Sequence, residues 1–487
     1  MRIDALTGND AVSALDRIDQ IVVLMLENRS FDHMLGYLSL HGRDDVNGLR
    51  PGFSNTYSGT TYPIHHAPST ASKPYQDPSH TGSAVKTQIA GGAMSGFVQS
   101  YVESVNPTHR AQAIAETDSY VMGYFEGSDV PTYDHLAGNF CICDSWFASV
   151  PGATWPNRLY SIAGESGGRV DNKRLFNKFD FPFFALPSFV RHLDDADVSW
   201  RWYHWSPSEL EPPTLQLVDP RYLLRPGEHF ALVNEREPIT GQPSFVDDAL
   251  AGRLPSVSWL DPNFYDTVSG PQNDDHPPTD AINGQHLVRM VANAMMSGPQ
   301  WETSMLVVLY DEHGGFYDHV APPAAADDRA DFRSYGVRVP SMVVSPYVDA
   351  RSVSSVTYDH TSLIKTILTR FCRSGETVPS MGARVDAAEH LGGLLTSTTP
   401  RAAVPVPELA TALAPAQTLR AATEAGGEGA LGALRSTSAH HLAEVVPGVL
   451  ASSDEPEFAS KGMHIHPNDL QLGLAAMAGE LREVRSR

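Results

Sequence analysis

Residues 18–33 read Ile18-Asp-Gln-Ile-Val-Val-Leu-Met-Leu-Glu-Asn-Arg-Ser-Phe-Asp-His33, an apolar run that stops on a cluster of polar side chains. The apolar part, from Ile21 to Leu26, has the length and composition of a strand that is buried on both faces of a parallel sheet. Such sheets bind ligands just beyond the carboxyl ends of their strands. Glu27 and Asn28 occupy that position and suit a hard cation or a polarised substrate group. Taken alone, the stretch is equally compatible with a strand that ends in a turn, and Ser30 is placed to cap a following helix.

The composition indicates a globular protein. The 487 residues suffice for one large α/β domain with an accessory segment, and hydrophobic residues make up 41% of the chain. A net charge of −22 argues against extended contact with nucleic acid or anionic lipid. No apolar run approaches the length that a bilayer requires, and no secretory signal is visible. We therefore expect a cytoplasmic protein as written, or an exported one if a signal was removed.

The region from roughly residue 37 to 130 is rich in Gly, Ser, Thr, Pro and Tyr, which predicts loops and short helices that cross the top of the sheet. Within it lies Asp77-Pro-Ser-His80; a lone loop histidine is more often a surface side chain than a ligand. Residues 134–147 predict a helix that leads into a strand. The three cysteines, Cys141, Cys143 and Cys372, form neither a disulfide framework nor a zinc motif, so we interpret them as structural.

Thr154 lies in the stretch Ser149-Val-Pro-Gly-Ala-Thr-Trp-Pro-Asn-Arg158, directly before a predicted helix. A hydroxyl at a tight turn before a helix N-terminus faces free backbone N–H groups, which suits a nucleophile that attacks phosphorus. The commoner use of a threonine at this place is as an N-cap.

Two further strands are predicted in Trp200-Arg-Trp-Tyr-His-Trp205 and in residues 254–262, and His204 at the end of the first is a candidate site residue. His276 lies in a polar loop before a helix predicted over about 281–296, where flanking acids and prolines would hold its ring in place.

A second strand, Met305 to Tyr310, again ends in ligand-type residues, Asp311-Glu-His-Gly-Gly-Phe-Tyr-Asp-His-Val320. The two strand ends can bring four oxygen ligands around one ion: Glu27, Asn28, Asp311 and Glu312. Because adjacent buried acids repel each other without a cation, a metal is the simplest explanation. The glycine pair Gly314-Gly315 fits a turn with close backbone approach.

The last core strand is predicted in Val337-Arg-Val-Pro-Ser-Met-Val-Val-Ser-Pro346, and a helix begins near His360. After about residue 385 the composition shifts to Ala, Leu, Glu and Pro. We therefore predict a catalytic domain over 1–385 and a helical accessory segment over 386–487.

Four of these stretches resemble the successive signatures of the bacterial phospholipase C and acid phosphatase phosphoesterase family, which also includes plant non-specific phospholipases C. They are Glu27-Asn-Arg-Ser-Phe-Asp32, Thr154-Trp-Pro-Asn-Arg158, Asp311 to Val320 and Val337-Arg-Val-Pro340. The resemblance covers roughly residues 18–370 and implies an alkaline-phosphatase-like three-layer α/β/α sandwich with a mostly parallel central sheet.

The resemblance also implies roles for individual residues. Thr154 would be the nucleophile and would touch one divalent metal held by the strand-end ligands, while Asn157 would contact the phosphoryl oxygens. His80 and His276 match family stretches that bring histidines to the phosphate, and His204 rests on its position alone. Hard oxygen ligands favour Ca²⁺, Mg²⁺ or Mn²⁺ without excluding Zn²⁺.

The implied activity is hydrolysis of a phosphate ester through a phosphothreonine, with an imidazole, His276 by preference, as the proton donor. A phospholipase C is the first interpretation, and an acid phosphatase is the alternative because both share every motif. A non-catalytic phosphate- or lipid-binding module would not need Thr154. Trp202 and Trp205 suit contact with a quaternary ammonium group or, more commonly for tryptophan, burial in the core.

Overall fold

A computed structural model describes residues 1–71, 77–117, 120–172, 184–205, 213–222, 229–236, 241–264, 271–277 and 279–410. Its centre is a sheet of eight strands in the order β12-β6-β11-β10-β1-β9-β7-β8. The strands are β1 (Gln20–Leu26), β6 (Cys141–Cys143), β7 (Trp200–His204), β8 (Phe230–Leu232), β9 (Val257–Leu260), β10 (Ser304–Tyr310), β11 (Ser341–Val344) and β12 (Ser352–Ser354). Only β11 runs antiparallel to its neighbours, so the predicted mostly parallel sheet is confirmed.

Strand β1 lies in the middle of this sheet, between β9 and β10, and is parallel to both. Every residue of β1 and of β10 is buried, which agrees with their continuous apolar sequences. The register pairs Leu26 with Tyr310, the last residues of the two strands. The two polar sequences that follow therefore start side by side at the carboxyl edge of the sheet.

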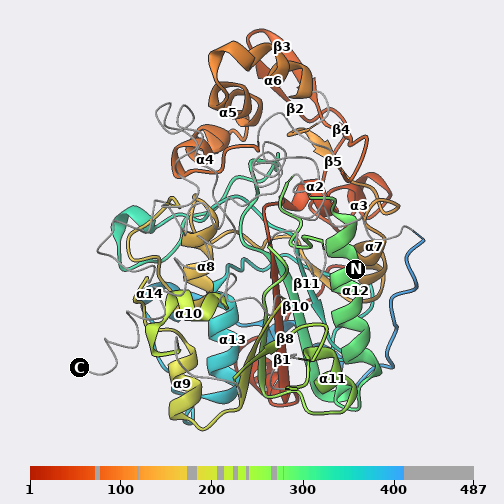
Figure 1. The fold of residues 1–487 in the computed structure, drawn as a ribbon, viewed down its shortest axis with the longest axis vertical. Coiled ribbons are helices and arrows are strands. Elements are labelled where there is room, and N and C mark those ends of the chain that lie inside the picture. Colours follow the sequence, from red (N-terminus) through yellow and green to blue (C-terminus); the bar gives the residue numbers. More distant parts are fainter. Residues whose placement is uncertain are drawn as a thin grey trace.

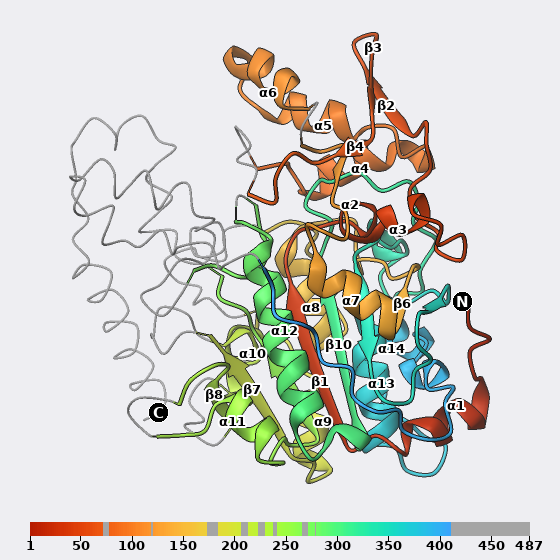
Figure 2. The ribbon, with the colours of Figure 1, turned by 90° about the vertical axis from the view of Figure 1, so that its right-hand side faces the viewer.

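Helices cover both faces of the sheet, as Figures 1 and 2 show. One face carries α7 (Pro131–Asn139), α11 (Phe245–Leu250) and α12 (Ile282–Ser297). The other carries α8 (Thr154–Ala163), α9 (Val190–Asp195), α10 (Thr214–Val218), α13 (Thr361–Phe371) and α14 (Ala383–Ala387), with α1 (Gly8–Leu15) against α13. The predicted three-layer α/β/α arrangement is confirmed.

A lobe built from the early part of the chain lies beyond the carboxyl ends of the strands (Figure 1). It contains α2 (Phe31–Leu35), α3 (Tyr37–Leu40), α4 (Gly82–Ile89), α5 (Phe97–Ser104) and α6 (Arg110–Thr117). The sequence predicted short helices here, but it missed two small sheets, which pair β2 (Ser54–Tyr57) with β3 (Thr60–Pro63) and β4 (His65–His66) with β5 (Gly123–Tyr124). Strands this short carry too little alternation to be recognised.

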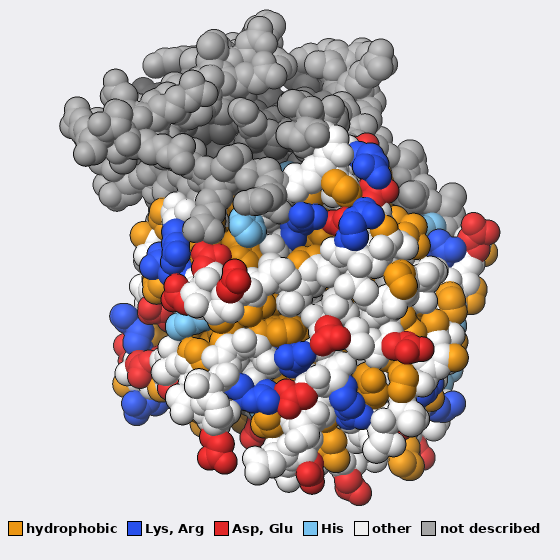
Figure 3. All heavy atoms as spheres, turned by 90° about the horizontal axis from the view of Figure 1, so that it is seen from below, with side chains coloured by type: hydrophobic (Ala, Val, Ile, Leu, Met, Phe, Trp, Pro, Cys, Tyr) orange, Lys and Arg blue, Asp and Glu red, His pale blue; other side chains and the backbone are white. Residues whose placement is uncertain are grey.

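Short 3₁₀ helices complete the described elements: η1 (Ala90–Gly92), η2 (Pro107–His109), η3 (Pro220–Tyr222), η4 (Trp301–Thr303), η5 (Ala330–Phe332) and η6 (Leu391–Leu394). The three cysteines are free thiols, as predicted. Figure 3 shows the face at the amino ends of the strands, where acidic and basic side chains are interspersed over the described part, as on an ordinary solvent-facing surface.

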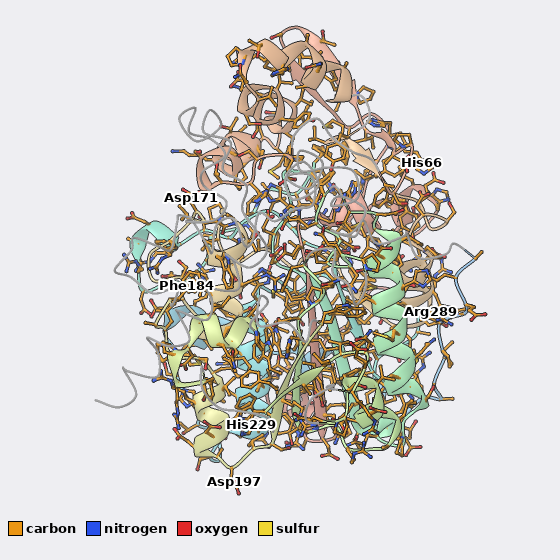
Figure 4. All side chains as sticks on the ribbon, viewed as in Figure 1. His66, Asp171, Phe184, Asp197, His229 and Arg289 are labelled. Carbon is orange, nitrogen blue, oxygen red and sulfur yellow. The ribbon has the colours of Figure 1, made fainter. Side chains whose placement is uncertain are left out.

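The segment that follows α14 packs against helices of the three-layer sandwich. The Asn293 side chain of α12 donates to the Val406 carbonyl at 2.9 Å and accepts from the Val406 N–H at 2.8 Å. Arg289, labelled in Figure 4, donates from Nε to the Pro407 carbonyl at 2.8 Å. Val406 and Pro407 therefore pack on α12, whereas residues 411–487 of the predicted helical segment lie outside the described residues.

Candidate active site

The polar residues after β1 and β10 meet at the carboxyl edge of the sheet. The Asn28 backbone N–H donates to Asp311 Oδ1 at 3.3 Å, which ties the two strand ends together. Asn28 has a φ of 60°, in the left-handed region that asparagine tolerates better than most residues. This backbone turn directs Glu27 and Asn28 away from the strand line and toward the second signature segment.

The glycine pair after Glu312 permits a close approach of two loops. A Cβ on Gly314 would lie 2.1 Å from the Asn28 carbonyl oxygen, and one on Gly315 would lie 2.7 Å from Pro78. Both glycines also have positive φ values, 62° and 74°. The predicted close backbone approach is therefore confirmed, and it brings the segment with His80 against the end of β10.

Thr154 is the first residue of α8, and its Oγ1 lies 3.5 Å from Asn28 Oδ1. The N-cap of the helix is Ala153, which has an extended backbone and no side-chain capping bond. Thr154 is thus not the N-cap, contrary to the common alternative use of threonine. Its side chain is 4% exposed. The hydroxyl lies at a helix N-terminus next to a strand-end amide, where a phosphoryl group would meet backbone N–H groups.

Asn157 shapes the turn that presents Thr154. Its Oδ1 accepts from the Val150 N–H at 3.0 Å, and its Nδ2 donates to the carbonyls of Gly152 at 3.1 Å and Ala153 at 3.0 Å. The side chain is fully buried. Both ends of this amide are therefore engaged with the backbone before α8, which the sequence, with its predicted phosphoryl contact, did not anticipate.

His80 and His276 lie together, although they are distant in sequence. Their rings are 6.2 Å apart and nearly perpendicular, and each Nδ1 hydrogen-bonds a nearby backbone carbonyl, at 3.0 Å for His80 and 2.6 Å for His276. Because a carbonyl only accepts, Nδ1 carries the proton in the neutral ring and Nε2 carries the lone pair. His276 Nε2 lies 3.7 Å from Asp77 Oδ2. Ligand atoms of these three residues all lie within 4.8 Å of one another.

Asp77 was not predicted as a site residue, although it opens the quoted Asp77-to-His80 stretch. Burial raises its pKa to about 7. His204 lies at the end of β7, and β9 separates that strand from β1. His204 does not belong to the cluster that the described histidines and acids form around Asp77. Its role stays a prediction.

Burial dominates the electrostatics of the strand-end acids. It raises the pKa of Glu27 to about 8 and that of Asp311 to about 6, although a neighbouring arginine opposes both shifts. Burial alone would also raise the pKa of Glu312, but His80, His313 and the Gly314 N–H outweigh it and lower the pKa. Glu312 is thus the most strongly ionised of the three acids.

The arginine between these acids is Arg158. It is the last residue of the motif that begins at Thr154, and the sequence predicted no role for it. Its Nη2 lies 3.0 Å from Glu27 Oε1, and its Nε lies 3.1 Å from Asp311 Oδ2. The signal that could have identified it is its spacing of four residues from Thr154, which places both on one face of α8. The guanidinium joins α8, the helix that carries Thr154, to both strand ends.

The donor set at the strand ends fits a hard divalent cation. Carboxylates, an amide oxygen and a hydroxyl are its preferred ligands. Glu312 Oε1 is buried without a hydrogen-bond partner among the described residues, and its ion-pair partner His80 Nδ1 lies 3.9 Å away. The ligand atoms of the three predicted carboxylates do not all lie within 4.8 Å of one another, and Glu27 and Asp311 pair with Arg158 instead.

A second buried ionic cluster joins three of the signature segments. Asp32 Oδ2 contacts His319 Nδ1 at 2.6 Å, and Arg338 pairs with Asp32 at 3.1 Å and with Asp318 at 2.9 Å. Arg338 is fully buried between the two carboxylates. Arg338 pairs with both carboxylates and His319 pairs with Asp32, so the cluster ties together the loops that carry the site.

The tryptophans considered for ligand contact are part of the core. Trp202 is 1% exposed, stacks on Trp259 with ring centroids 4.8 Å apart, and donates from Nε1 to Asp261 at 2.7 Å. Trp205 is also buried. The commoner alternative for both side chains, burial, is therefore confirmed, and contact with a quaternary ammonium group is not supported.

Comparison with known proteins adds an independent line of observation. The family model of the phosphoesterase family matches residues 18–372. The chain is 32% identical over 420 residues to non-specific phospholipase C6 of Arabidopsis thaliana, covering 81% of this chain and 75% of the relative. It is 30% identical over 421 residues to phospholipase C A of Mycobacterium tuberculosis (strain ATCC 25618 / H37Rv), covering 76% and 75%. Among solved structures, it is similar to phosphonate monoester hydrolase SpPMH from Silicibacter pomeroyi, at 12% identity over 55% of this chain and 72% of that chain, with a TM-score of 0.31.

Proposed function

Since this chain belongs to the phosphoesterase family it is a phosphoric ester hydrolase, and we propose that it acts as a phospholipase C, which cleaves phospholipids at the glycerol–phosphate bond. The observation that carries this proposal is the Thr154 hydroxyl, held at the N-terminus of α8 beside Asn28. The names of the relatives favour a phospholipase over a phosphomonoesterase. Acid phosphatase activity is the second candidate, because the same residues would serve both reactions.

In the proposed reaction, Thr154 Oγ1 attacks phosphorus in line with the leaving diacylglycerol oxygen. The Thr154 Oγ1–phosphorus bond forms as the hydroxyl proton is lost to solvent and the bond to the glycerol oxygen breaks, and a phosphothreonine that carries the head group results. Water then hydrolyses this ester and regenerates the hydroxyl. Asn157 contributes by fixing the turn before α8, so the hydroxyl and the helix N-terminus keep their positions.

We assign Glu27, Asn28, Asp311, Glu312 and Thr154 as the residues that would hold one divalent metal. Such an ion, when bound, would lower the pKa of the hydroxyl and cancel charge on the phosphoryl oxygens. Without it, the same residues still order the site, because the Asn28 N–H binds Asp311 and the Glu312 carboxylate accepts from the Gly314 N–H at 2.8 Å.

The leaving alkoxide needs a proton, and His276 is the proposed donor. Its ring is buried and held by the carbonyl contact at Nδ1, so in the protonated ring Nε2 carries the proton to be transferred. Asp77 Oδ2 lies 3.7 Å from His276 Nε2, and the ionised Asp77 carboxylate would favour the protonated ring of His276. His80, which lies between this pair and Glu312, is proposed to contact the phosphoryl group rather than the leaving oxygen.

Any action on lipid is proposed to be interfacial and transient. Within the described residues, no helix is both long enough and apolar enough to cross a bilayer. The net charge of −22 opposes lasting contact with an anionic surface. Neutral choline lipids are therefore the expected substrates.

The deciding experiment compares three substrates with one protein preparation: a chromogenic phosphomonoester, a chromogenic phosphodiester and phosphatidylcholine in mixed micelles. Thr154→Val, purified in parallel, measures the contaminating activity. A phospholipase C hydrolyses phosphatidylcholine and the diester faster than the monoester. A faster monoester reaction would instead assign an acid phosphatase, and no turnover above the Thr154→Val background would leave only a binding module.

A further inference from the structure

Arg158 occupies a place between the two strand ends that no catalytic step uses. It lies four residues after Thr154 on α8, and its guanidinium pairs with Glu27 at 3.0 Å and with Asp311 at 3.1 Å. It is 1% exposed. Since a buried arginine is costly unless it is paired, its presence beside two proposed metal ligands requires a reason.

The guanidinium is also fixed by neutral groups. Its Nη2 lies 3.4 Å from the carbonyls of both Met25 and Leu26, and its Cζ lies 5.0 Å from the ring centroid of Phe264. These contacts come from β1 and from the loop after β9. Arg158 therefore cannot move without disturbing the edge of the sheet, and the two carboxylates take their positions from it.

Charge counting links this geometry to the metal site. Glu27, Asp311 and Glu312 carry three negative charges when ionised, and Arg158 supplies one positive charge, which leaves the two that a single divalent ion cancels. Two other acids, Asp261 and Asp274, also act on Arg158, but among the described residues its ion pairs are those with Glu27 and Asp311.

We propose that Arg158 is a positioning residue whose positive charge offsets the repulsion between the Glu27 and Asp311 carboxylates. The protein can therefore fold without metal and then bind a single divalent ion. The inference rests on the proposed metal site. It explains why these two carboxylates pair with Arg158 and do not converge together with Glu312 on one point. Loss of Arg158 should make folding depend on the metal.

The test measures Tm of Arg158→Met, with and without metal, against a matched control. Arg384 is equally buried, pairs with Asp327 at 3.2 Å and Asp359 at 3.4 Å, and lies 4.9 Å from the ring of Tyr160, but touches no proposed ligand. Arg384→Met should lower Tm by the same amount in both conditions. Each protein is scanned with EDTA and then with an excess of Ca²⁺ or of Mn²⁺, and bound metal is counted by elemental analysis.

We expect the metal to raise the Tm of Arg158→Met at least about twice as much as that of wild type or Arg384→Met. Arg158→Lys, which keeps the charge, should return the gain toward the wild-type value. Equal gains in all variants, with one ion bound per wild-type chain, would overturn the role of Arg158 alone. A wild-type protein that binds neither ion would overturn the metal site and this inference with it.

If Arg158→Met does not fold in either condition, the double variant Glu27→Gln/Arg158→Met decides. It removes the positive charge together with one of its partners, so the repulsion between the acids is relieved. The double variant should fold in EDTA. Its failure to fold would show that Arg158 supports the sheet by packing alone, which would overturn the proposal.

Discussion

Thr154→Val tests the proposed nucleophile with the smallest change of shape. Valine replaces the hydroxyl by a methyl group and keeps the β-branched outline of a side chain that is 4% exposed. The helix does not depend on the hydroxyl, because its N-cap is Ala153. We therefore expect the fold and the proposed metal ligands that follow the two strands to stay in place.

The structure separates the expected effects on stability and on rate. The contact of Thr154 Oγ1 with Asn28 Oδ1, at 3.5 Å, is at the outer limit of a hydrogen bond, so its loss should cost less than about 1 kcal/mol of unfolding free energy. Loss of the nucleophile should lower kcat about 10⁴-fold or more, equivalent to about 5 kcal/mol of transition-state stabilisation.

The assay follows the hydrolysis of a chromogenic phosphodiester under single-turnover conditions. Acid quenching of the wild-type protein, followed by peptide mass spectrometry, should detect the phosphoryl group on Thr154. Thr154→Ser is the control, because it keeps a hydroxyl at the helix N-terminus; we expect it to retain activity within about tenfold of wild type.

Two results would refute this reasoning. One is a folded Thr154→Val protein, with an unchanged Tm, that retains activity near that of wild type. The other is a phosphoryl adduct that maps to a different residue. A loss of activity accompanied by unfolding would refute the claim that the hydroxyl is dispensable for the fold.

Four further outcomes are expected. Glu312→Gln should lower the metal content of dialysed protein well below that of wild type while circular dichroism is unchanged; equal metal content in elemental analysis would argue against this ligand. The metal-induced rise in Tm should grow from about pH 6 to about pH 9, because burial raises the pKa of Glu27 to about 8 and that of Asp311 to about 6. At a pH below these pKa values, protons bound to the two carboxylates stabilise the metal-free protein and compete with the ion. At a higher pH the metal-free protein loses this stabilisation. A metal-induced rise in Tm that becomes smaller as the pH increases would contradict the prediction. Arg338→Met should lower the unfolding free energy measured in urea by about 3–5 kcal/mol, because it leaves Asp32 in a buried cluster without its cation; a change below about 1 kcal/mol would show that the cluster does not tie the loops together. Phosphatidylcholine vesicles should be hydrolysed faster than phosphatidylglycerol vesicles at low salt, since the chain carries a net charge of −22, and a preference for the anionic lipid would contradict this.

The strands that carry the site were predictable because burial on both faces leaves a simple sequence pattern. The runs of β1 and β10 are continuous and apolar, and each ends abruptly in polar residues. The pairing of Leu26 with Tyr310 was not visible in either run, because register arises from contacts between segments that are distant in sequence. The small sheets of the upper lobe escaped prediction for the same reason.

The sequence predicted the positions of some candidate site residues better than their contacts. Asn28 and Asp311 were identified from strand ends, and the structure places them in contact. Asn157 was assigned to the phosphoryl group, yet its side chain is engaged with the turn before α8, a role that depends on backbone geometry alone. Arg158 and Asp77 were not predicted because the residues that they contact, Glu27, Asp311 and His276, are distant from them in sequence.

The central place of β1 has a consequence for how the chain is made. β1 is synthesised first, but its parallel neighbours are β9, which begins at Val257, and β10, which begins at Ser304. A strand that is apolar from Ile21 to Leu26 must therefore stay unpaired with these neighbours until more than half of the chain has been synthesised. Contacts of such long sequence separation slow folding and expose aggregation-prone segments. Slow folding on the ribosome, with a need for chaperones that cover β1, is built into this strand order.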